Sequence, residues 1–231
     1  MKVTLKLATS LDGRIATASG ESRWITGPAA REQVHRLRAM HQSVLVGVST
    51  AIADDPQLTV RMPGYVGLQP LRVVLDSRQR LPSDTHLVRE AERLPTLVVT
   101  TSNPNKRLTD AGVTVVKVAA TEGWPDLHET LGAIAGFQGD RLAAVVQGDD
   151  ASKIAGAGSV LIEGGGQVAA SFLKAGLVDA IEWFRAPIVL GDEGRPAVGD
   201  FPLNRLADAP RFRRVAVQAL DDDLWERYER L

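Results

Sequence analysis

Most of the chain consists of short apolar runs separated by polar segments, and the spacing of those runs predicts the secondary structure. In residues 3–7, Val3, Leu5 and Leu7 occupy one face and more polar residues the other, which predicts a strand. A polar loop follows. Four further runs also predict strands, the first of them buried: Val44–Val46, Leu71–Leu75, Thr96–Thr100 and Val113–Val116.

Residues with helical spacing lie between these strands. Pro28 suits the first position of a helix, and the apolar residues after it recur at the helical period (Ala30, Val34 and Leu37). Residues 104–111 predict a second, short helix that ends in a glycine cap at Gly112. Strands that alternate with helices favour a three-layer α/β/α fold with a mainly parallel sheet.

The C-terminal part of the chain breaks this alternation. Residues 180–186 predict a strand, and Val215, Val217 and Ala219 alternate along another. Asp221–Asp223 predicts a turn, after which residues 224–228 return, so we expect a C-terminal antiparallel hairpin. No repeat or long linker interrupts the chain, and we expect a single domain over residues 1–231. Residues 139–158 are compatible with a helix, a strand or both.

The composition limits the classes of function. The 231 residues include 27 basic and 28 acidic side chains, so no bulk positive field would attract nucleic acid. Cysteine is absent and no histidine pair has ligand spacing, so we expect neither disulfides nor a metal site. The first residues are too polar for a signal peptide and no long apolar run follows. We therefore expect a cytoplasmic globular protein without nucleic-acid or membrane partners.

The strongest local signal runs from Val160 to Leu173. An apolar strand ends at Glu163, three glycines follow (Gly164, Gly165 and Gly166), and a helix begins. Glycines let a backbone approach a ligand closely, and a helix N-terminus presents N–H groups to an anion, so the segment predicts phosphate binding. A simple strand-to-helix turn is the alternative. The dinucleotide-binding glycine pattern also fits, with Glu182 about twenty residues on, but Glu182 is expected near the start of its strand, where it would not reach a ribose.

A second group of polar residues follows the strand at Val46. Small hydroxyl residues after Gly47 offer donors to a cofactor, although an ordinary helix cap is as good an interpretation. Asp54-Asp55-Pro56 comes next, and we expect Pro56 to hold Asp55 in an extended conformation. Arg38 and Arg61 are the best candidates for binding an anionic substrate, because a guanidinium matches the geometry of phosphate oxygens.

Several ordered motifs together resemble the reductase domain of the riboflavin-biosynthesis deaminase–reductase family. The resemblance covers nearly the whole chain. The motifs that carry it are Ser10–Ala16, Ser19–Thr26, Asp54–Arg61, Glu163–Gly166, Phe172–Asp179 and Ala186–Gly191.

This resemblance implies a dihydrofolate-reductase-like fold, NADPH as hydride donor and a phosphorylated ribosylamino-pyrimidine as substrate, reduced at ribose C1′ to the ribityl product. The implied cofactor-binding residues are Trp24, Thr50, Asp54, Ser77, Gly165, Gly166 and Gln167. The implied substrate-binding residues are Ser22, Arg38, Leu58, Arg61 and Glu163. Asp54 and Glu163 are the candidate proton donors, with water as the alternative. We also expect Arg78 to bind the cofactor's 2′-phosphate.

The sequence leaves alternatives open for the substrate, the function and the oligomeric state. Bifunctional members of the family carry a zinc deaminase domain with cysteine ligands, so we expect this cysteine-free chain not to deaminate by that route. Its substrate is either the deaminated or the diamino pyrimidine. A pterin reductase of the same fold and a non-catalytic NADPH-binding module are the rival functions. Relatives are commonly dimers, and the apolar C-terminal hairpin offers an interface for a homodimer.

Overall fold

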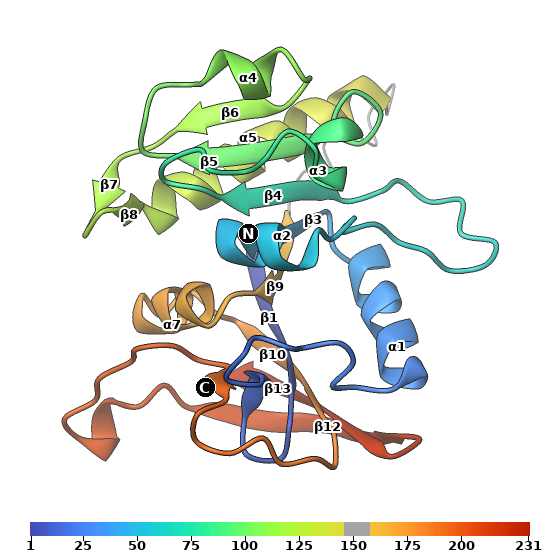
Figure 1. The fold of residues 1–231 in the computed structure, drawn as a ribbon, viewed down its shortest axis with the longest axis vertical. Helices are drawn as coiled ribbons and strands as arrows, with labels where there is room; N and C mark the ends of the chain where they lie inside the picture. Colours follow the sequence, from blue (N-terminus) through green and yellow to red (C-terminus); the bar gives the residue numbers. More distant parts are fainter. Residues whose placement is uncertain (146–157) are drawn as a thin grey trace. The chain divides into compact units, whose positions relative to one another are not determined.

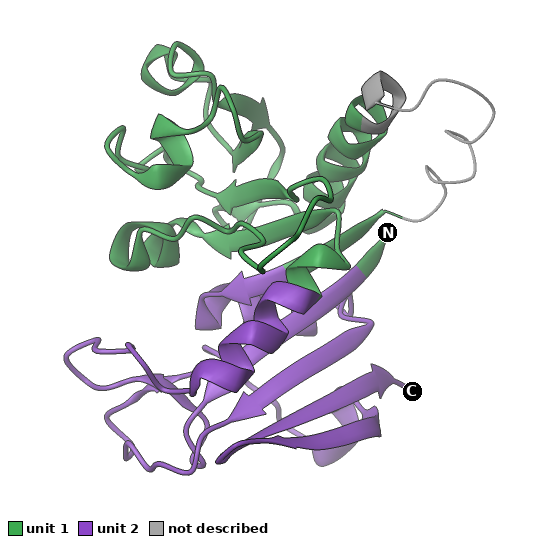
Figure 2. Ribbon diagram, turned by 90° about the vertical axis from the view of Figure 1, so that its right-hand side faces the viewer, with its two compact units in different colours: residues 1–2, 37–161 green, residues 3–36, 162–231 purple. Residues whose placement is uncertain are grey.

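The computed structural model describes residues 1–145 and 158–231, and the chain divides into two compact units (Figure 2). Unit 1 contains residues 1–2 and 37–161, and unit 2 contains residues 3–36 and 162–231. The prediction of one domain over residues 1–231 stays a prediction. Of the ambiguous segment 139–158, residues 139–145 belong to a helix and residues 146–157 lie outside the described residues.

Four parallel strands of unit 1 pair side by side (Figure 1). They follow one another in space as in sequence: β3 (Ser43–Gly47), β4 (Leu71–Leu75), β5 (Thr96–Thr100) and β6 (Thr114–Lys117). All five residues of β3 and of β5 are buried, as expected for strands covered on both faces. The predicted strands of this region are therefore confirmed.

Among the described residues, the helices that lie wholly in unit 1 are α2 (Val48–Asp54), α3 (His86–Arg89), α4 (Lys106–Thr109) and α5 (Leu127–Val145). The predicted helix over residues 104–111 is only one turn long. Its start is set by Asn105, whose side chain accepts a hydrogen bond from the Arg107 N–H at 2.9 Å. Gly112 has a φ of 80° and ends the turn as predicted.

Unit 2 combines parallel and antiparallel strands. β1 (Lys2–Thr9) runs parallel to β10 (Ala180–Arg185), and β10 runs antiparallel to β13 (Asp223–Arg230). β12 (Phe212–Leu220) pairs antiparallel with β13, which confirms the C-terminal hairpin. Asp223 belongs to the strand and not to the turn, because its carboxylate is buried and accepts a hydrogen bond from the Gly27 N–H at 2.6 Å.

The remaining elements complete the two units. α1 (Pro28–Ala39) begins in unit 2, and β9 (Ser159–Gly164) leads into α7 (Gly166–Lys174). The sequence did not predict two short strand pairs, which are β2 (Arg14–Ala16) with β11 (Arg195–Pro196) and β7 (Ala120–Thr121) with β8 (Trp124–Pro125), nor the 3-10 turn η1 (Leu206–Asp208). Within the described residues, no helix has the length and apolar character needed to cross a bilayer.

Candidate active site

The glycine-rich segment forms the predicted strand-to-helix junction in unit 2. Glu163 is the second-last residue of β9 and is half-buried. Gly165 precedes α7 with a φ of 97° and a ψ of 112°, and no side chain caps the helix. The first N–H groups of a helix have no acceptor within that helix. The N-terminus of α7, at Gly166 and Gln167, therefore has the electrostatic character of an anion site.

The glycines of this junction also have purely structural reasons to be glycines. Gly165 has a backbone conformation that side chains rarely adopt. A Cβ on Gly166 would lie 2.7 Å from the Pro196 carbonyl oxygen and 3.3 Å from the Gly199 nitrogen. The Gly199 N–H also donates to the Gly166 carbonyl at 2.8 Å. Backbone geometry and the packing of residues 196–199 thus explain two of the three glycines without a ligand.

The same unit holds Ser22 and Trp24 in the loop before α1. The Trp24 indole is 70% exposed, and the Arg31 guanidinium carbon lies 4.6 Å from its ring centroid. Arg31 is itself held by a hydrogen bond to the Thr26 carbonyl at 2.7 Å. Ser22 is half-buried, and its carbonyl accepts a hydrogen bond from Ile25. The Arg23 guanidinium carbon also lies 5.9 Å from the ring centroid, so this loop combines an exposed indole with two cations.

In unit 1, both predicted phosphate-binding arginines form hydrogen bonds with residues of the segment 57–61, to which Arg61 itself belongs. Arg38 Nη1 donates to the Thr59 carbonyl at 2.9 Å, and Arg61 Nη1 donates to Gln57 Oε1 at 2.7 Å. These bonds order two guanidinium groups along one short segment. Leu58 as a whole residue, main chain included, is only 1% exposed and belongs to the core.

Thr50 and Asp54 lie on α2 of unit 1, and both are half-buried. The expectation that Asp55 is extended is wrong. Asp55 caps α2 in the left-handed conformation, with a φ of 40° and a ψ of 56°. Its Oδ1 accepts a hydrogen bond from the His86 N–H at 2.8 Å, at the start of α3. Aspartate tolerates this conformation better than most residues, and the helix cap together with this bond outweighs the preference that Pro56 imposes.

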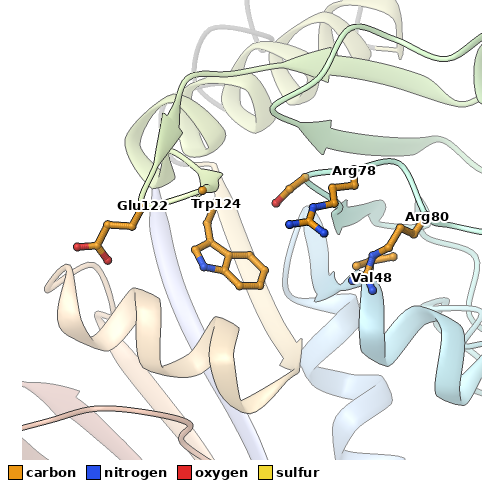
Figure 3. A pocket seen from close by; sticks show the side chains of 7 residues that line it. Val48, Arg78, Arg80, Glu122 and Trp124 are labelled. Atoms are coloured by element: carbon orange, nitrogen blue, oxygen red, sulfur yellow. The ribbon is translucent and has the colours of Figure 1, made fainter.

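A cavity of about 300 Å³ lies in unit 1, beside the loop that follows β4. Figure 3 shows the guanidinium groups of Arg78 and Arg80 and the indole of Trp124 facing it, while the Glu122 carboxylate points away. Ser77 and Val48 also line the cavity. The structure thus brings together Ser77 and Arg78, two predicted cofactor contacts, with Arg80 and Trp124, which the sequence analysis missed.

Arg80 and Trp124 were missed for different reasons. Arg80 stands two residues after Arg78, and this short spacing is the feature of the sequence from which a second cation at the same site could have been predicted. Trp124 follows a two-residue turn at Glu122 and Gly123, where φ is 52° and 81°. The two strands flanking that turn have two residues each, which is too short for a pattern of apolar residues to predict them.

Glu182, the acid of the alternative dinucleotide pattern, has a structural role. It is 2% exposed, its Oε2 accepts a hydrogen bond from Trp225 Nε1 at 2.8 Å, and its Oε1 lies 3.7 Å from Arg227 Nε. A carboxylate held inside the sheet in this way does not reach a ribose. Among the described residues, no group of three potential metal ligands comes together.

The predicted site residues are thus divided between the two units. Unit 2 holds Ser22, Trp24, Glu163, Gly165, Gly166 and Gln167. Unit 1 holds Arg38, Thr50, Asp54, Leu58, Arg61, Ser77 and Arg78.

Comparison with known proteins identifies the family. The model of the RibD C-terminal domain matches residues 1–225. The riboflavin biosynthesis protein RibD of Chlamydia pneumoniae is 38% identical over 231 residues, covering 96% of this chain and 56% of that protein. The chain thus spans about half the length of the curated relatives it matches.

Solved structures agree with this match. Acinetobacter baumannii RibD superposes with a TM-score of 0.82 and 32% identity, covering all of this chain and 58% of that one. A Thermotoga maritima protein described as a diaminohydroxyphosphoribosylaminopyrimidine deaminase/5-amino-6-(5-phosphoribosylamino)uracil reductase superposes with a TM-score of 0.74 and 26% identity, covering 56% of its length. These matches confirm the dihydrofolate-reductase-like fold class expected from the sequence motifs. The chain belongs to the RibD C-terminal domain family.

Proposed function

We propose that the chain reduces the ribosyl group of a phosphorylated ribosylamino-pyrimidine to a ribityl group, with NADPH as the hydride donor. The observation that carries the proposal is the family match over residues 1–225. The Thermotoga relative is named for a deaminase and a reductase activity. The reductase activity is the one compatible with this chain, because the zinc deaminase reaction needs cysteine ligands and the chain has none.

The proposed reaction needs little acid–base chemistry from the protein. NADPH, when bound, supplies a hydride to C1′ of the open-chain imine. The C=N double bond becomes a single bond, and a proton must reach the nitrogen. The main task of the protein is then to hold the two reacting carbons about 3–3.5 Å apart. Asp54 and Glu163 are our candidates for delivering the proton, directly or through water.

Each unit contributes groups suited to one part of this task. In unit 2, the N-terminus of α7 at Gly165–Gln167 suits the cofactor's pyrophosphate, and Ser22, Trp24 and Glu163 are proposed ligand contacts. In unit 1, Arg38 and Arg61 are held on the segment 57–61 and suit the substrate phosphate. Thr50, Asp54 and Ser77 are the proposed cofactor contacts of that unit, and Leu58 is a proposed substrate contact on the segment 57–61.

The direct test follows nicotinamide absorbance with NADPH and each pyrimidine, deaminated and diamino, in separate reactions. We expect oxidation with one of the two forms and formation of the ribityl product in equal amount. Dihydrofolate serves as the comparison substrate. Oxidation with dihydrofolate alone would identify a pterin reductase, and NADPH binding without any oxidation would identify a non-catalytic module.

The assignment of the proton donor needs a second measurement. We expect either Asp54→Asn or Glu163→Gln to lower kcat, and the pH profile of kcat to lose its basic limb in that variant. Because Asp54 is also a proposed cofactor contact, only Glu163→Gln is expected to leave the Kd for NADPH little changed. If both variants retain full kcat, the proton comes from water. Such a result would leave the proposed reduction itself intact.

Association of two copies is part of the proposal. β12 forms an edge of the sheet in unit 2, and its Val215 and Val217 side chains are 43% and 54% exposed. Burying such apolar side chains against a second copy would stabilise a dimer. Sedimentation velocity of the full chain and of a Val217→Lys variant tests this surface, with a monomer expected for the variant.

A further inference from the structure

We propose that Asp55 is a positioning residue, which fixes the end of α2 relative to the segment 57–61 through a hydrogen bond to α3. This inference rests on the proposed function, because α2 carries two proposed cofactor contacts and the segment 57–61 carries the proposed substrate contact Arg61. The juxtaposition that carries it is a left-handed aspartate between these two groups, bonded to a short helix that a fully buried arginine holds in place.

The backbone leaves α2 through a single left-handed residue. Asp55 has a φ of 40° and a ψ of 56°, a conformation that ends a helix and redirects the chain after it. Leu58 and Val60 are then 1% and 4% exposed, so the segment 57–61 is anchored in the core. A change in the Asp55 backbone would therefore move Asp54, the last residue of α2, relative to this segment.

The Asp55 carboxylate holds this conformation by a contact outside α2. Its Oδ1 accepts a hydrogen bond from the His86 N–H at 2.8 Å, and its Oδ2 lies 3.7 Å from His86 Nε2. His86 begins α3, and the first N–H groups of a helix need acceptors from outside that helix. The residue before it, Thr85, donates its hydroxyl to the Pro82 carbonyl at 2.9 Å. Asp55 thus ends α2 and caps α3.

Arg72 of β4 holds α3 in place. Arg72 is fully buried, and its guanidinium donates to the carbonyls of His86, Leu87 and Leu94 at 3.4, 3.2 and 2.7 Å. The Glu90 carboxylate lies 3.5 Å from the same group. Burial lowers the pKa of Arg72 to about 10, so the guanidinium stays charged near neutral pH. A buried charge cannot move without losing these partners, and α3 is therefore a fixed support.

These contacts form a closed chain within unit 1. β4 pairs with β3, β3 leads directly into α2, and α2 ends at Asp55, which is bonded to α3. Arg72 connects α3 back to β4. The Asp55 side chain is 41% exposed, whereas that of Arg72 is 0% exposed. Asp55 can therefore be substituted without leaving a buried charge unpaired or opening a cavity.

Hydride transfer depends on the relative position of the two groups that Asp55 connects. Each ligand alone needs one of the groups, whereas the reaction needs both at once. Loss of the Asp55–His86 hydrogen bond should therefore lower kcat more than it weakens the binding of NADPH. A misplacement of about 1 Å can reduce a rate roughly a hundredfold. A role in stability alone would leave the kcat of the folded protein unchanged.

Two substitutions separate the hydrogen bond from the backbone conformation. Asp55→Asn keeps an oxygen acceptor and tolerates the left-handed conformation, so it should retain the wild-type kcat. Asp55→Gly also adopts a positive φ but has no acceptor. We expect Asp55→Gly to lower kcat about tenfold or more and to change the Kd for NADPH little. Initial rates with the pyrimidine substrate and titration of NADPH measure the two quantities.

α4 provides the matched control. It has four residues, as α3 does, and Asn105 caps it by accepting a hydrogen bond from the Arg107 N–H at 2.9 Å. Asn105→Ala and Asp55→Gly each remove one side-chain acceptor, so both should lower Tm by about 2–4 °C. Asn105→Ala should retain full kcat. Equal losses of kcat in the two variants would show that kcat follows stability alone, which would overturn the proposal.

A double variant tests whether Arg72 acts through Asp55. Arg72→Lys replaces the guanidinium fork by a point charge, so it should loosen α3 and lower kcat. Because the effect passes through the Asp55–His86 hydrogen bond, Arg72→Lys/Asp55→Gly should have the kcat of Asp55→Gly. Losses that multiply in the double variant would refute the connection through α3. If Arg72→Lys does not fold, the Asp55 variants decide the proposal.

Hydrogen exchange distinguishes failure of this inference from failure of the proposed function. The His86 amide should exchange faster in Asp55→Gly than in the wild type and stay protected in Asp55→Asn, whether or not the chain is active. A chain with this exchange pattern that reduces neither pyrimidine has the structural connection but lacks the proposed reaction. A chain that reduces a pyrimidine with the same kcat in Asp55→Gly has the proposed function, and Asp55 is then not a positioning residue.

Discussion

Two of the regions proposed to bind a phosphate are built in opposite ways. The junction of β9 and α7 in unit 2 offers main-chain N–H groups, and its glycines are required by a φ of 97° at Gly165 and by packing at Gly166. The cavity of unit 1 offers side chains from the loop 77–80 and from Trp124. A backbone site is inseparable from the fold that forms it, whereas a side-chain site can change its specificity while the fold persists.

We expect the largest effect from a substitution at Gly166, where the junction of β9 and α7 packs against Pro196. Gly166→Val would place side-chain atoms against the Pro196 carbonyl, because even a Cβ would lie 2.7 Å from that oxygen. We expect a loss of about 3 kcal/mol in the free energy of unfolding, measured by urea denaturation. Gly132→Ala is the matched control, since a Cβ there meets nothing within 4 Å, and helix propensity predicts a gain of roughly 0.5–1 kcal/mol. Equal stability of Gly166→Val and the wild type would show that this junction is not tightly packed.

The second effect tests whether the side-chain site depends on its loop. Asp76→Ala leaves the buried Leu81 N–H without its acceptor, and we expect a loss of about 2 kcal/mol in stability. Because the loop also positions Ser77 and Arg78, two proposed cofactor contacts, the Kd for NADPH should rise in parallel. An unchanged Kd for NADPH in a destabilised variant would mean that these contacts do not need the loop to be ordered.

The third effect distinguishes the proposed substrate-phosphate site at Arg61 from the proposed cofactor-phosphate site at Arg78. Both sites lie in unit 1. Arg61→Ala should raise the KM for the pyrimidine substrate about tenfold, as expected for one charged contact, and leave the Kd for NADPH unchanged. The double variant Arg78→Ala/Arg80→Ala should do the reverse. Initial rates and titration of NADPH measure both quantities. Parallel losses in both quantities for Arg61→Ala would refute the assignment of Arg61 to the substrate.

The smallest effect is an acid transition in unit 2. The pKa of Asp12 is lowered from 3.8 to about 2, chiefly by the Ser10 hydroxyl and also by the Leu190 and Gly191 N–H groups. Its contribution to stability is therefore complete above pH 3.8 and is lost as the pH falls through about 2. The Gly13 carbonyl, next to Asp12, accepts a hydrogen bond from the Ala197 N–H. Because residues 196–199 pack against Gly166, we expect this packing to loosen over the same pH range.

Asp12→Asn provides the control for this transition. An amide does not titrate, so the loss of stability at acid pH should be smaller in the variant than in the wild type by the contribution of Asp12. Hydrogen exchange at Ala197 and Gly199 reports the loosening locally. An unchanged acid limb in Asp12→Asn would assign the transition to other carboxylates.

The sequence by itself determined the order of the longer strands, the helix that begins at Pro28, the C-terminal hairpin and the glycine junction. These features follow from local patterns: apolar runs in β3, β4 and β5, alternation in β12, and glycines at a strand end. Where two local preferences conflict, the sequence was insufficient. Pro56 favours an extended Asp55, but a helix cap and a hydrogen bond to His86 hold it in the left-handed conformation. The actual length of α4 likewise depended on the Asn105 cap.

Only the tertiary structure decided which side chains share a space. Arg80 and Trp124 are separated by 44 positions and meet at one cavity because the loop after β4 and the hairpin after β6 converge on it. Leu58 became a core residue and Glu182 a buried hydrogen-bond acceptor for the same kind of reason. Local patterns are set by neighbours along the chain, whereas a binding cavity is set by contacts between distant segments, which no local pattern records.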